Sequence, residues 1–305
     1  MPHYDLCLAW NWEYDCDFVR LLEEASRKLD LTFLSVCAEN LESTLAGLSG
    51  REISFSAFLD RASDSDPRFQ ALADKACQEY IYRINLRELA AWSADKATMH
   101  LEFISRGLDT PYTILLPPYD DQASLPPPDL TLLGGRFAIK PGSLGGGEGV
   151  LLEGVSLEQV QNARQQYPKE KYLLQAQVIP QELGGRRAWF RLLVCDGAVY
   201  PCWWDPGSHA YARVTADERF RYSLRSMNEI ARRIACICRL DLFSTEIALA
   251  QNGNFLVVDY VNDPVDLRLQ STTADGVPDA IVENISRRLA RLAQRHRRDP
   301  SNENT

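Results

Sequence analysis

A lysine at the end of an apolar segment precedes a loop that is rich in glycine. The segment FAIK ends at Lys140, and the loop after it contains Gly145, Gly146, Gly147 and Gly149. Glycine lets backbone N–H groups approach an anion closely, because no Cβ stands in the way. Apolar residues return in GVLLEGV, so the loop joins two predicted strands and does not have the polar flanks of a linker. This pattern favours a phosphate lid, with a plain mobile hairpin tip as the alternative.

The glycine loop does not fit two well-known phosphate-binding motifs. A Walker A loop places its lysine after the glycines and a helix next, whereas here the lysine comes first. The dinucleotide-binding fingerprint leads into a helix, whereas a strand is predicted to follow this loop. A second lysine, Lys96, opens a predicted helix earlier in the chain. The sequence therefore offers two cations and a flexible loop outside either motif.

Carboxylates and an amide gather near the end of the chain. Glu246 lies in STEIALA, and Asp259 and Asn262 lie in NFLVVDYVND, with Asn252–Gly253 between the two apolar segments. Asn-Gly at this place predicts a tight hairpin, which brings the two strands side by side. Mg²⁺ prefers carboxylate oxygens together with phosphate oxygens. These residues are therefore candidate magnesium ligands.

The spacing of the late acids leaves one question open. Residues two apart on a strand share a face, yet the residue two before Asn262 is Tyr260, and Asp259 lies one residue further back. A β-bulge, which inserts one extra residue into a strand, could bring Asp259 to the same face. Asp263 is a second candidate. The acid beside Asn262 is therefore predicted to be Asp259 or Asp263.

The elements that must position these residues follow a simple order. Strand and helix patterns alternate over residues 1–93, which is typical of a small parallel sheet with flanking helices. A helix is predicted from about residue 94 to residue 106, and hairpins with helices follow the glycine loop. We therefore expect an N-terminal α/β domain at 1–93, a central lobe at 94–178, a C-terminal lobe at 179–298 and a disordered tail at 299–305.

The order of these features resembles that of the ATP-grasp superfamily, which includes glutathione synthetase and D-alanine–D-alanine ligase. The resemblance covers about residues 85–262 and rests on N…DK, GLDTPYT, FAIKP…GGGEGV, YLLQAQVI and TEIAL…NFLVVDYVN, which occur in the family's usual order. It implies an α/β (α+β) fold with a preceding βα domain, a small central lobe, and a C-terminal catalytic lobe with an antiparallel sheet. ATP would lie between the two lobes, beneath the glycine flap.

The resemblance also implies roles for individual residues in binding ATP. Lys96 and Lys140 match the lysines that contact the nucleotide, and the four glycines match the flap whose amides cover the phosphates. The segment that matches the adenine-binding hinge acts mostly through its backbone. Its residues are Gln175, Ala176, Gln177 and Val178, and Glu182 beyond them would serve the ribose. The alternative is an interior strand with Gln175 and Gln177 on its exposed face.

The catalytic and metal-binding roles implied by the resemblance fall on the last part of the chain. Arg191 matches an arginine that stabilises a transferring phosphoryl or acyl-phosphate group, which suits a bidentate guanidinium. Arg268 would hold a substrate carboxylate, and its alternative is an ion pair with Asp266 or Asp263. The late hairpin matches the magnesium site, and the ligands implied there are Glu246, Asp259 and Asn262.

The resemblance implies a ligase that joins a carboxylate to an amine, or a similar nucleophile, through an acyl phosphate with release of ADP. ATP and Mg²⁺ would be its cofactors, and a small molecule carrying a carboxylate would be its partner. Two alternatives stay open: an ATP-dependent small-molecule kinase on the same fold, and a nucleotide-binding protein with a degenerate catalytic site. The sequence leaves the oligomeric state open between monomer and homodimer.

Composition and charge argue against several other classes of protein. The chain has 305 residues and a formal net charge of −9, which argues against a general nucleic-acid or membrane binder. No apolar run could span a bilayer and no secretory signal is present, so we expect a cytoplasmic protein with eight reduced cysteines. The basic segment at 287–298 is the local exception: a packed C-terminal helix is one interpretation, and an anion or RNA contact is the other.

Overall fold

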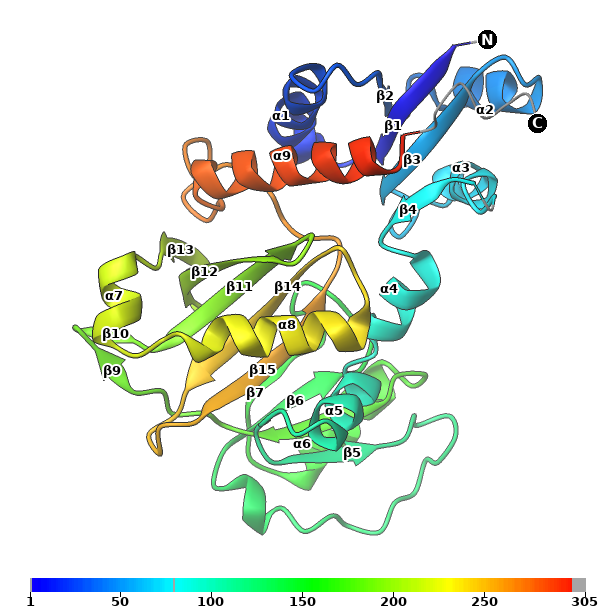
Figure 1. Ribbon diagram of the computed structural model, residues 1–305. Helices are drawn as coiled ribbons and strands as arrows, with labels where there is room; N and C mark the ends of the chain where they lie inside the picture. The colour runs from blue at the N-terminus through cyan, green and yellow to red at the C-terminus, as the bar shows by residue number, and fades with distance from the viewer. Residues whose placement is uncertain (1, 79, 298–305) are drawn as a thin grey trace.

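The three larger sheets lie one below the other in the computed structural model, which describes residues 2–78 and 80–297 (Figure 1). The first sheet is parallel, and the other two are antiparallel. This arrangement confirms the predicted α/β class. The expected boundaries after residues 93 and 178 stay predictions, and the expected tail at 299–305 lies outside the described residues.

The first sheet has the strand order β2–β1–β3–β4 and is covered by helices on both faces. Apolar residues from alternate positions of β1 and β3 fill two separate cores, one with α1 and the other with α2 and α3. A parallel sheet buried in this way needs apolar residues on both faces of its strands. Its elements are β1 (His3–Trp10), α1 (Cys16–Arg27), β2 (Phe33–Val36), α2 (Leu41–Ser49), β3 (Ser54–Arg61), α3 (Gln70–Lys75) and β4 (Tyr82–Ile84), with 3₁₀ turns at Glu13–Asp15 and Pro67–Phe69.

The second sheet has the order β13–β12–β11–β14–β15. Alternation along β11 turns Leu192 toward the core under α8 and Leu193 toward the core shared with the first sheet. The predicted turn at Asn252–Gly253 joins two strands of this sheet, and so does a second turn at Asp196–Gly197. Its elements are β11 (Trp189–Cys195), β12 (Ala198–Asp205), β13 (Ala210–Arg213), α7 (Ala216–Arg221), α8 (Ser226–Cys238), β14 (Leu242–Leu249) and β15 (Phe255–Asn262).

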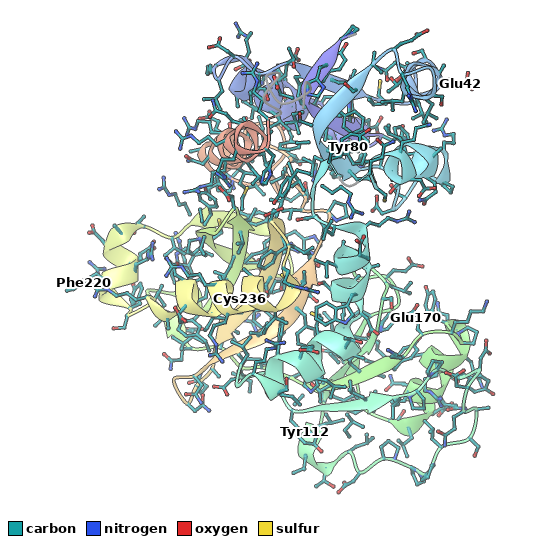
Figure 2. The ribbon with its side chains drawn as sticks, turned by 45° about the vertical axis from the view of Figure 1, so that its right-hand side comes forward. Glu42, Tyr80, Tyr112, Glu170, Phe220 and Cys236 are labelled. Atoms are coloured by element: carbon teal, nitrogen blue, oxygen red, sulfur yellow. The ribbon has the colours of Figure 1, made fainter. Side chains whose placement is uncertain are left out.

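The outer side of this sheet carries α7 and α8, where the labelled side chains of Phe220 and Cys236 point to solvent (Figure 2). None of the helices in the described part of the chain combines the length and apolar composition needed to cross a bilayer.

The third sheet has the order β5–β8–β6–β7 and contains the glycine loop. The loop joins β6 to β7 as the predicted hairpin, with Phe137 paired to Gly154 and Ile139 to Leu151. The expected helix near residue 94 is present as α5, which Asp95 caps through the amides of the first turn. The elements of this region are α4 (Arg87–Ala94), α5 (Lys96–Ser105), β5 (Thr113–Leu116), a 3₁₀ turn (Thr131–Leu133), β6 (Phe137–Pro141), β7 (Leu151–Gly154), α6 (Leu157–Gln166), β8 (Tyr172–Ala176) and the ribbon β9 (Glu182–Leu183) and β10 (Arg186–Arg187).

The last helix, α9 (Asp279–Arg295), returns to the first sheet and packs beside α1 (Figure 1). The packed helix that was one interpretation of the basic segment is present, and an apolar stripe along it is buried: Ile281, Ile285, Leu289 and Leu292 all lie in the core shared with β1 and β3. Burying such a side chain contributes roughly 1.5–3 kcal/mol. The helix therefore connects the end of the chain to its beginning.

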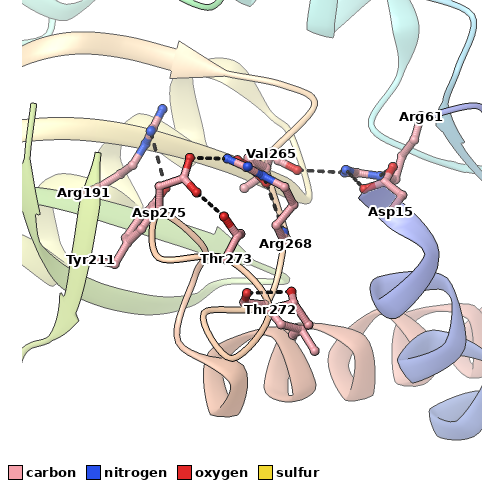
Figure 3. Close-up of polar contacts among 11 residues, drawn as sticks. Asp15, Arg61, Arg191, Tyr211, Val265, Arg268, Thr272, Thr273 and Asp275 are labelled. Carbon is pink, nitrogen blue, oxygen red and sulfur yellow. Dashed lines mark hydrogen bonds and ion pairs between the residues drawn. The ribbon is translucent and has the colours of Figure 1, made fainter. Parts of the chain in front are cut away.

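A buried ion pair also links the first sheet to the segment after β15. The Arg61 guanidinium donates from Nε and Nη2 to the two carboxylate oxygens of Asp15, at 2.9 and 2.7 Å, and from Nη1 to the Val265 carbonyl oxygen at 2.9 Å (Figure 3). The side chains of Arg61 and Asp15 are only 3% and 1% exposed. Removing one partner would therefore leave an uncompensated charge in the interior.

We predict that Asp15→Asn lowers the free energy of unfolding by about 3–5 kcal/mol, because the buried Arg61 charge loses its counter-ion. Denaturant titration followed by circular dichroism measures the change. Glu153→Gln is the matched control, since it removes the acid of the exposed pair Arg136–Glu153, and we expect almost no effect from it. Equal stability of the two variants would contradict the assigned weight of the buried pair.

Candidate functional site

One row of side chains crosses the second sheet and brings the predicted acids together. The strand register places Arg191 opposite Glu246, and Glu246 opposite Asp259. Between Ser244 and Glu246, β14 advances by two residues while β15 advances by three, from Asn262 to Asp259. The β-bulge considered from the sequence is therefore present, and it turns Asp259 to the side where Glu246 lies.

The amide of Asn262 joins the same group. Its Nδ2 donates to Oδ2 of Asp259 at 3.0 Å. The other candidate acid, Asp263, accepts a hydrogen bond at 2.8 Å from Nδ2 of Asn85, and burial raises its pKa to about 7. The geometry thus groups Asp259, and not Asp263, with Glu246 and Asn262.

The two buried carboxylates of this row have different surroundings. Burial raises the pKa of Glu246, although Arg191 opposes the shift with its Nη2 3.8 Å from Oε1, and Trp189 Nε1 donates to Oε2 at 3.1 Å. Burial also disfavours the charge of Asp259, but Lys140 and Lys96 outweigh it and lower that pKa. Lys140 of β6 and Lys96 of α5 therefore hold the Asp259 carboxylate in its charged form.

Lys140 bridges the second and third sheets. It lies on β6, its side chain is buried, and its Nζ donates to the Gln175 Oε1 at 2.7 Å and to the Val258 carbonyl oxygen of β15 at 3.2 Å. Burial lowers the pKa of Lys140, while Asp259 and Glu246 oppose that shift. An ammonium group so placed is expensive unless partners surround it, and these partners come from both sheets.

The side chain of Gln175 is buried, whereas one interpretation of the sequence placed it on an exposed face of the strand. The side chain is 1% exposed, accepts from Lys140, and donates from Nε2 to the Tyr260 hydroxyl at 3.1 Å. The Tyr260 hydroxyl lies 2.8 Å from Nδ1 of His100. Sequence reasoning missed both Tyr260 and His100. Tyr260 could have been noticed in the sequence, because it stands where the spacing calls for a second acid. Its side chain turns away from Asp259 and into the core under α8.

The glycine loop has a tethered base and an open tip. Nζ of Lys96 donates to the Leu144 carbonyl oxygen at 2.6 Å, so this lysine contacts the loop itself. Gly146 and Gly147 have positive φ, and a Cβ added at either would meet nothing within 4 Å. The acid of the loop, Glu148, accepts from the Tyr167 hydroxyl at 3.2 Å. The tip therefore leaves room above its backbone amides.

Arg191 lies on β11 and forms the end of the row that is nearest to β12. Its guanidinium lies over the Trp204 ring, 4.6 Å from the centroid, and Nη1 donates to the Tyr211 hydroxyl at 3.4 Å. Burial would lower the pKa of Arg191, but Glu246 and other anions raise it. Its Nε is buried and has no hydrogen-bond partner within residues 2–78 and 80–297. This buried donor therefore lies beside the carboxylates without a protein partner in that part of the chain.

Arg268 forms the ion pairs that were its alternative interpretation. Its Nη2 lies 2.7 Å from Oδ2 of Asp266 and 2.8 Å from Oδ2 of Asp275. Figure 3 draws the contact with Asp275. Asp266 was one of the two partners considered from the sequence, while Asp275 was not foreseen. The two carboxylates already balance its charge, and its predicted contact with a substrate carboxylate stays a prediction.

The rest of the predicted hinge extends from β8 to the ribbon β9. Ala176 ends β8 and is half-buried, and Gln177 donates from Nε2 to the Leu152 carbonyl oxygen at 3.0 Å. Val178 is half-buried, whereas Glu182 is exposed on β9. Their assigned contacts with adenine and ribose stay predictions.

The donor set of this site fits Mg²⁺ better than a soft metal. It has two carboxylates and one amide oxygen, and the described residues contain no group of three or more His, Cys, Asp or Glu side chains that could hold a metal ion. Mg²⁺ is usually held by one or two carboxylates together with phosphate oxygens and water. The neighbouring lysines, the open loop and the unpartnered Arg191 Nε suit the phosphates of a nucleotide.

Comparison with known proteins agrees with this arrangement at the level of the fold. No family model and no curated protein sequence matches the chain. An ATP-grasp RimK domain protein from Sphaerobacter thermophilus matches with a TM-score of 0.62 and 18% identity, over 92% of this chain and 97% of its own. The ATP-grasp ligase PsnB, solved with a minimal precursor, Mg and ADP, matches at 0.63 and 13%, over 96% and 98%. The D-alanine–D-alanine ligase of Bacillus anthracis, solved with ATP, matches at 0.60 and 11%, over 97% and 99%.

The chain therefore has the ATP-grasp fold, as the sequence resemblance predicted.

We predict that Gln175→Met lowers the free energy of unfolding by about 1–3 kcal/mol, because it leaves the buried Lys140 ammonium and the Tyr260 hydroxyl short of a partner. Thermal and denaturant unfolding measure the effect. Gln177→Met is the matched control, because Gln177 lies two residues further along the chain and is exposed. This variant should change stability little. A loss that is equal in the two variants would refute the role given to the Gln175 side chain.

Proposed function

We propose that this protein is an ATP- and Mg²⁺-dependent ligase that joins a carboxylate to an amine, or to a similar nucleophile, and releases ADP. The observation that carries the proposal is the row Arg191–Glu246–Asp259, whose Asp259 carboxylate is under the influence of Lys140 on β6 and Lys96 on α5. The likeness to ATP-grasp ligases supports the fold on which the proposal rests.

Under this proposal the triphosphate lies between the second and third sheets. Lys140 and Lys96 neutralise its charge, and the amides of the glycine loop cover its phosphates. Glu246, Asp259 and Asn262 hold Mg²⁺, which when bound draws negative charge from the phosphate oxygens. Tight packing of Lys140 between two strands fixes its ammonium group before the nucleotide arrives.

The reaction then depends on position and charge more than on a nucleophilic side chain. A carboxylate oxygen of the substrate attacks the γ-phosphorus, the bond to the β-γ bridging oxygen breaks, and ADP leaves. An amine nitrogen attacks the resulting acyl phosphate, phosphate leaves, and the amine loses one proton. The Arg191 guanidinium, with its free Nε, stabilises the charge on the transferring group. A cytoplasmic setting would supply ATP.

We predict that Lys140→Ala lowers the affinity for ATP tenfold or more, because a charge-assisted contact contributes about 1.5–3 kcal/mol. Isothermal titration calorimetry with ATP and Mg²⁺ measures it, after circular dichroism has shown that the variant is folded. Lys169→Ala, which removes an exposed lysine, serves as the control. Unchanged ATP binding in the Lys140 variant would refute the assigned contact.

We predict that Glu246→Gln reduces Mg²⁺-dependent ADP release by at least tenfold, because an amide is a poorer magnesium ligand than a carboxylate. The assay offers ATP, Mg²⁺, a panel of small carboxylic acids, and hydroxylamine, which traps an acyl phosphate as a hydroxamate. Glu158→Gln, at an exposed site, is the control and should behave as the unchanged protein.

The products of this assay separate the rival functions. Hydroxamate together with ADP supports the ligase. ADP with a stable phosphorylated product and no hydroxamate identifies a small-molecule kinase. ATP binding without turnover of any acid identifies a degenerate site.

A further inference from the structure

A hollow lined by arginines lies between α9 and the β12–β13 edge of the second sheet. Its volume is about 480 Å³, within the usual range of small-molecule sites. The polar side chains around it are Tyr200, Arg213, Asn284, Arg287, Arg288 and Arg291, and Ala198 and Ile281 add apolar surface. The basic segment noted in the sequence therefore contributes its arginines to a concave site.

The polar residues of α9 lie on one face of the helix. Asn284, Arg287, Arg288 and Arg291 are spaced at i, i+3, i+4 and i+7, which places them one above another. The opposite face is fixed in the core by residues such as Ile285 and Leu289. Like charges one turn apart weaken an isolated helix. The packed face therefore holds the arginines together despite their repulsion.

One arginine of the hollow is fixed by protein partners. Arg288 donates from Nε to the Tyr200 hydroxyl at 3.0 Å, and its Nη1 lies 3.7 Å from Oδ2 of Asp196. Asp196 is shared, because Nη2 of Arg295 lies 2.6 Å from its Oδ1. The Asp196 carboxylate is thus occupied by Arg288 and Arg295.

The other three arginines have no acidic partner. No ion pair links Arg213, Arg287 or Arg291 to any carboxylate within residues 2–78 and 80–297, and Arg287 donates only to the Asn284 amide oxygen at 2.8 Å. This local excess of positive charge occurs in a chain of net charge −9. Three unbalanced guanidinium groups around a small hollow suit an anion with more than one charged group.

The hollow opens on the same side of the second sheet as the candidate catalytic row. The register pairs Arg213 with Cys202, and Cys202 with Arg191, so these residues lie in one line across the strands. Neighbouring strands are about 4.8 Å apart, which places the backbones of Arg213 and Arg191 roughly 10 Å apart. The hollow is therefore close to the proposed ATP site but is built from other residues.

We propose that this hollow is a second anion site, which binds a small molecule carrying two or more phosphate or carboxylate groups. Arg213 contacts it from β13, while Arg287 and Arg291 contact it from α9, so the ligand joins the second sheet to the helix that packs on the first. A small concave site in an acidic protein does not match the extended basic surface that RNA requires. The proposal does not depend on the ligase activity.

The test is calorimetric titration of the full chain with inorganic pyrophosphate, without Mg²⁺ and at low salt. Arg287→Gln/Arg291→Gln should weaken binding tenfold or more, and glutamine keeps a similar helix propensity. Arg221→Gln/Arg225→Gln is the matched control, since it removes two exposed arginines four residues apart outside the hollow. It should bind pyrophosphate as the unchanged protein does.

Two further variants locate the binding. Arg213→Gln should also weaken binding, because the hollow has two walls, and full binding by this variant would overturn the two-walled site. Lys140→Ala should retain binding, and loss there would assign pyrophosphate to the ATP site instead. The proposal also fails if the unchanged protein does not bind pyrophosphate, or if the control pair weakens binding as much as the α9 pair. Citrate in a parallel titration shows whether carboxylates substitute for phosphates.

Discussion

The buried ammonium group of Lys140 connects the second and third sheets and sets the charge of the site between them. Lys140 lies on β6, and its ammonium group donates hydrogen bonds to Gln175 within its own sheet and to the Val258 carbonyl oxygen of β15. Because an unpartnered charge in the interior is costly, each sheet stabilises the placement of the other. The same group favours the ionised form of Asp259. Sheet packing and the charge of the candidate metal site therefore depend on one side chain.

Local sequence patterns predicted most of the elements that carry this arrangement. Two apolar segments joined by Asn-Gly located the hairpin of β14 and β15, and the glycines after Lys140 marked the loop. The bulge at Asp259 could be raised only as one of two options, because its register depends on how β14 and β15 pair. Gln175 was harder to interpret, since a polar residue on a strand usually indicates a face that is exposed to solvent. Here its side chain is the partner of a buried lysine from another strand.

Contacts between distant segments lay beyond those patterns. A packed C-terminal helix was one interpretation of the basic segment, but nothing in its sequence says that the helix returns to the first sheet. The pairing of Arg268 with Asp275 depends on the path of the loop between them, and the pairing of Arg61 with Asp15 depends on the sheet order. Such contacts depend on how the strands and helices are ordered in space. Local patterns in a single sequence do not give that order.

The charges of the candidate site favour a nucleotide and a metal together over either one alone. Lys96, Lys140 and Arg191 surround Glu246 and Asp259, so the cations exceed the carboxylates by one. A lone Mg²⁺ at the carboxylates would meet repulsion from these cations, and a lone triphosphate would meet repulsion from the acids. When both are present, the phosphates face the cations and the metal faces the acids, so each removes the repulsion that opposes the other. Under the proposed function, ATP and Mg²⁺ should therefore bind cooperatively.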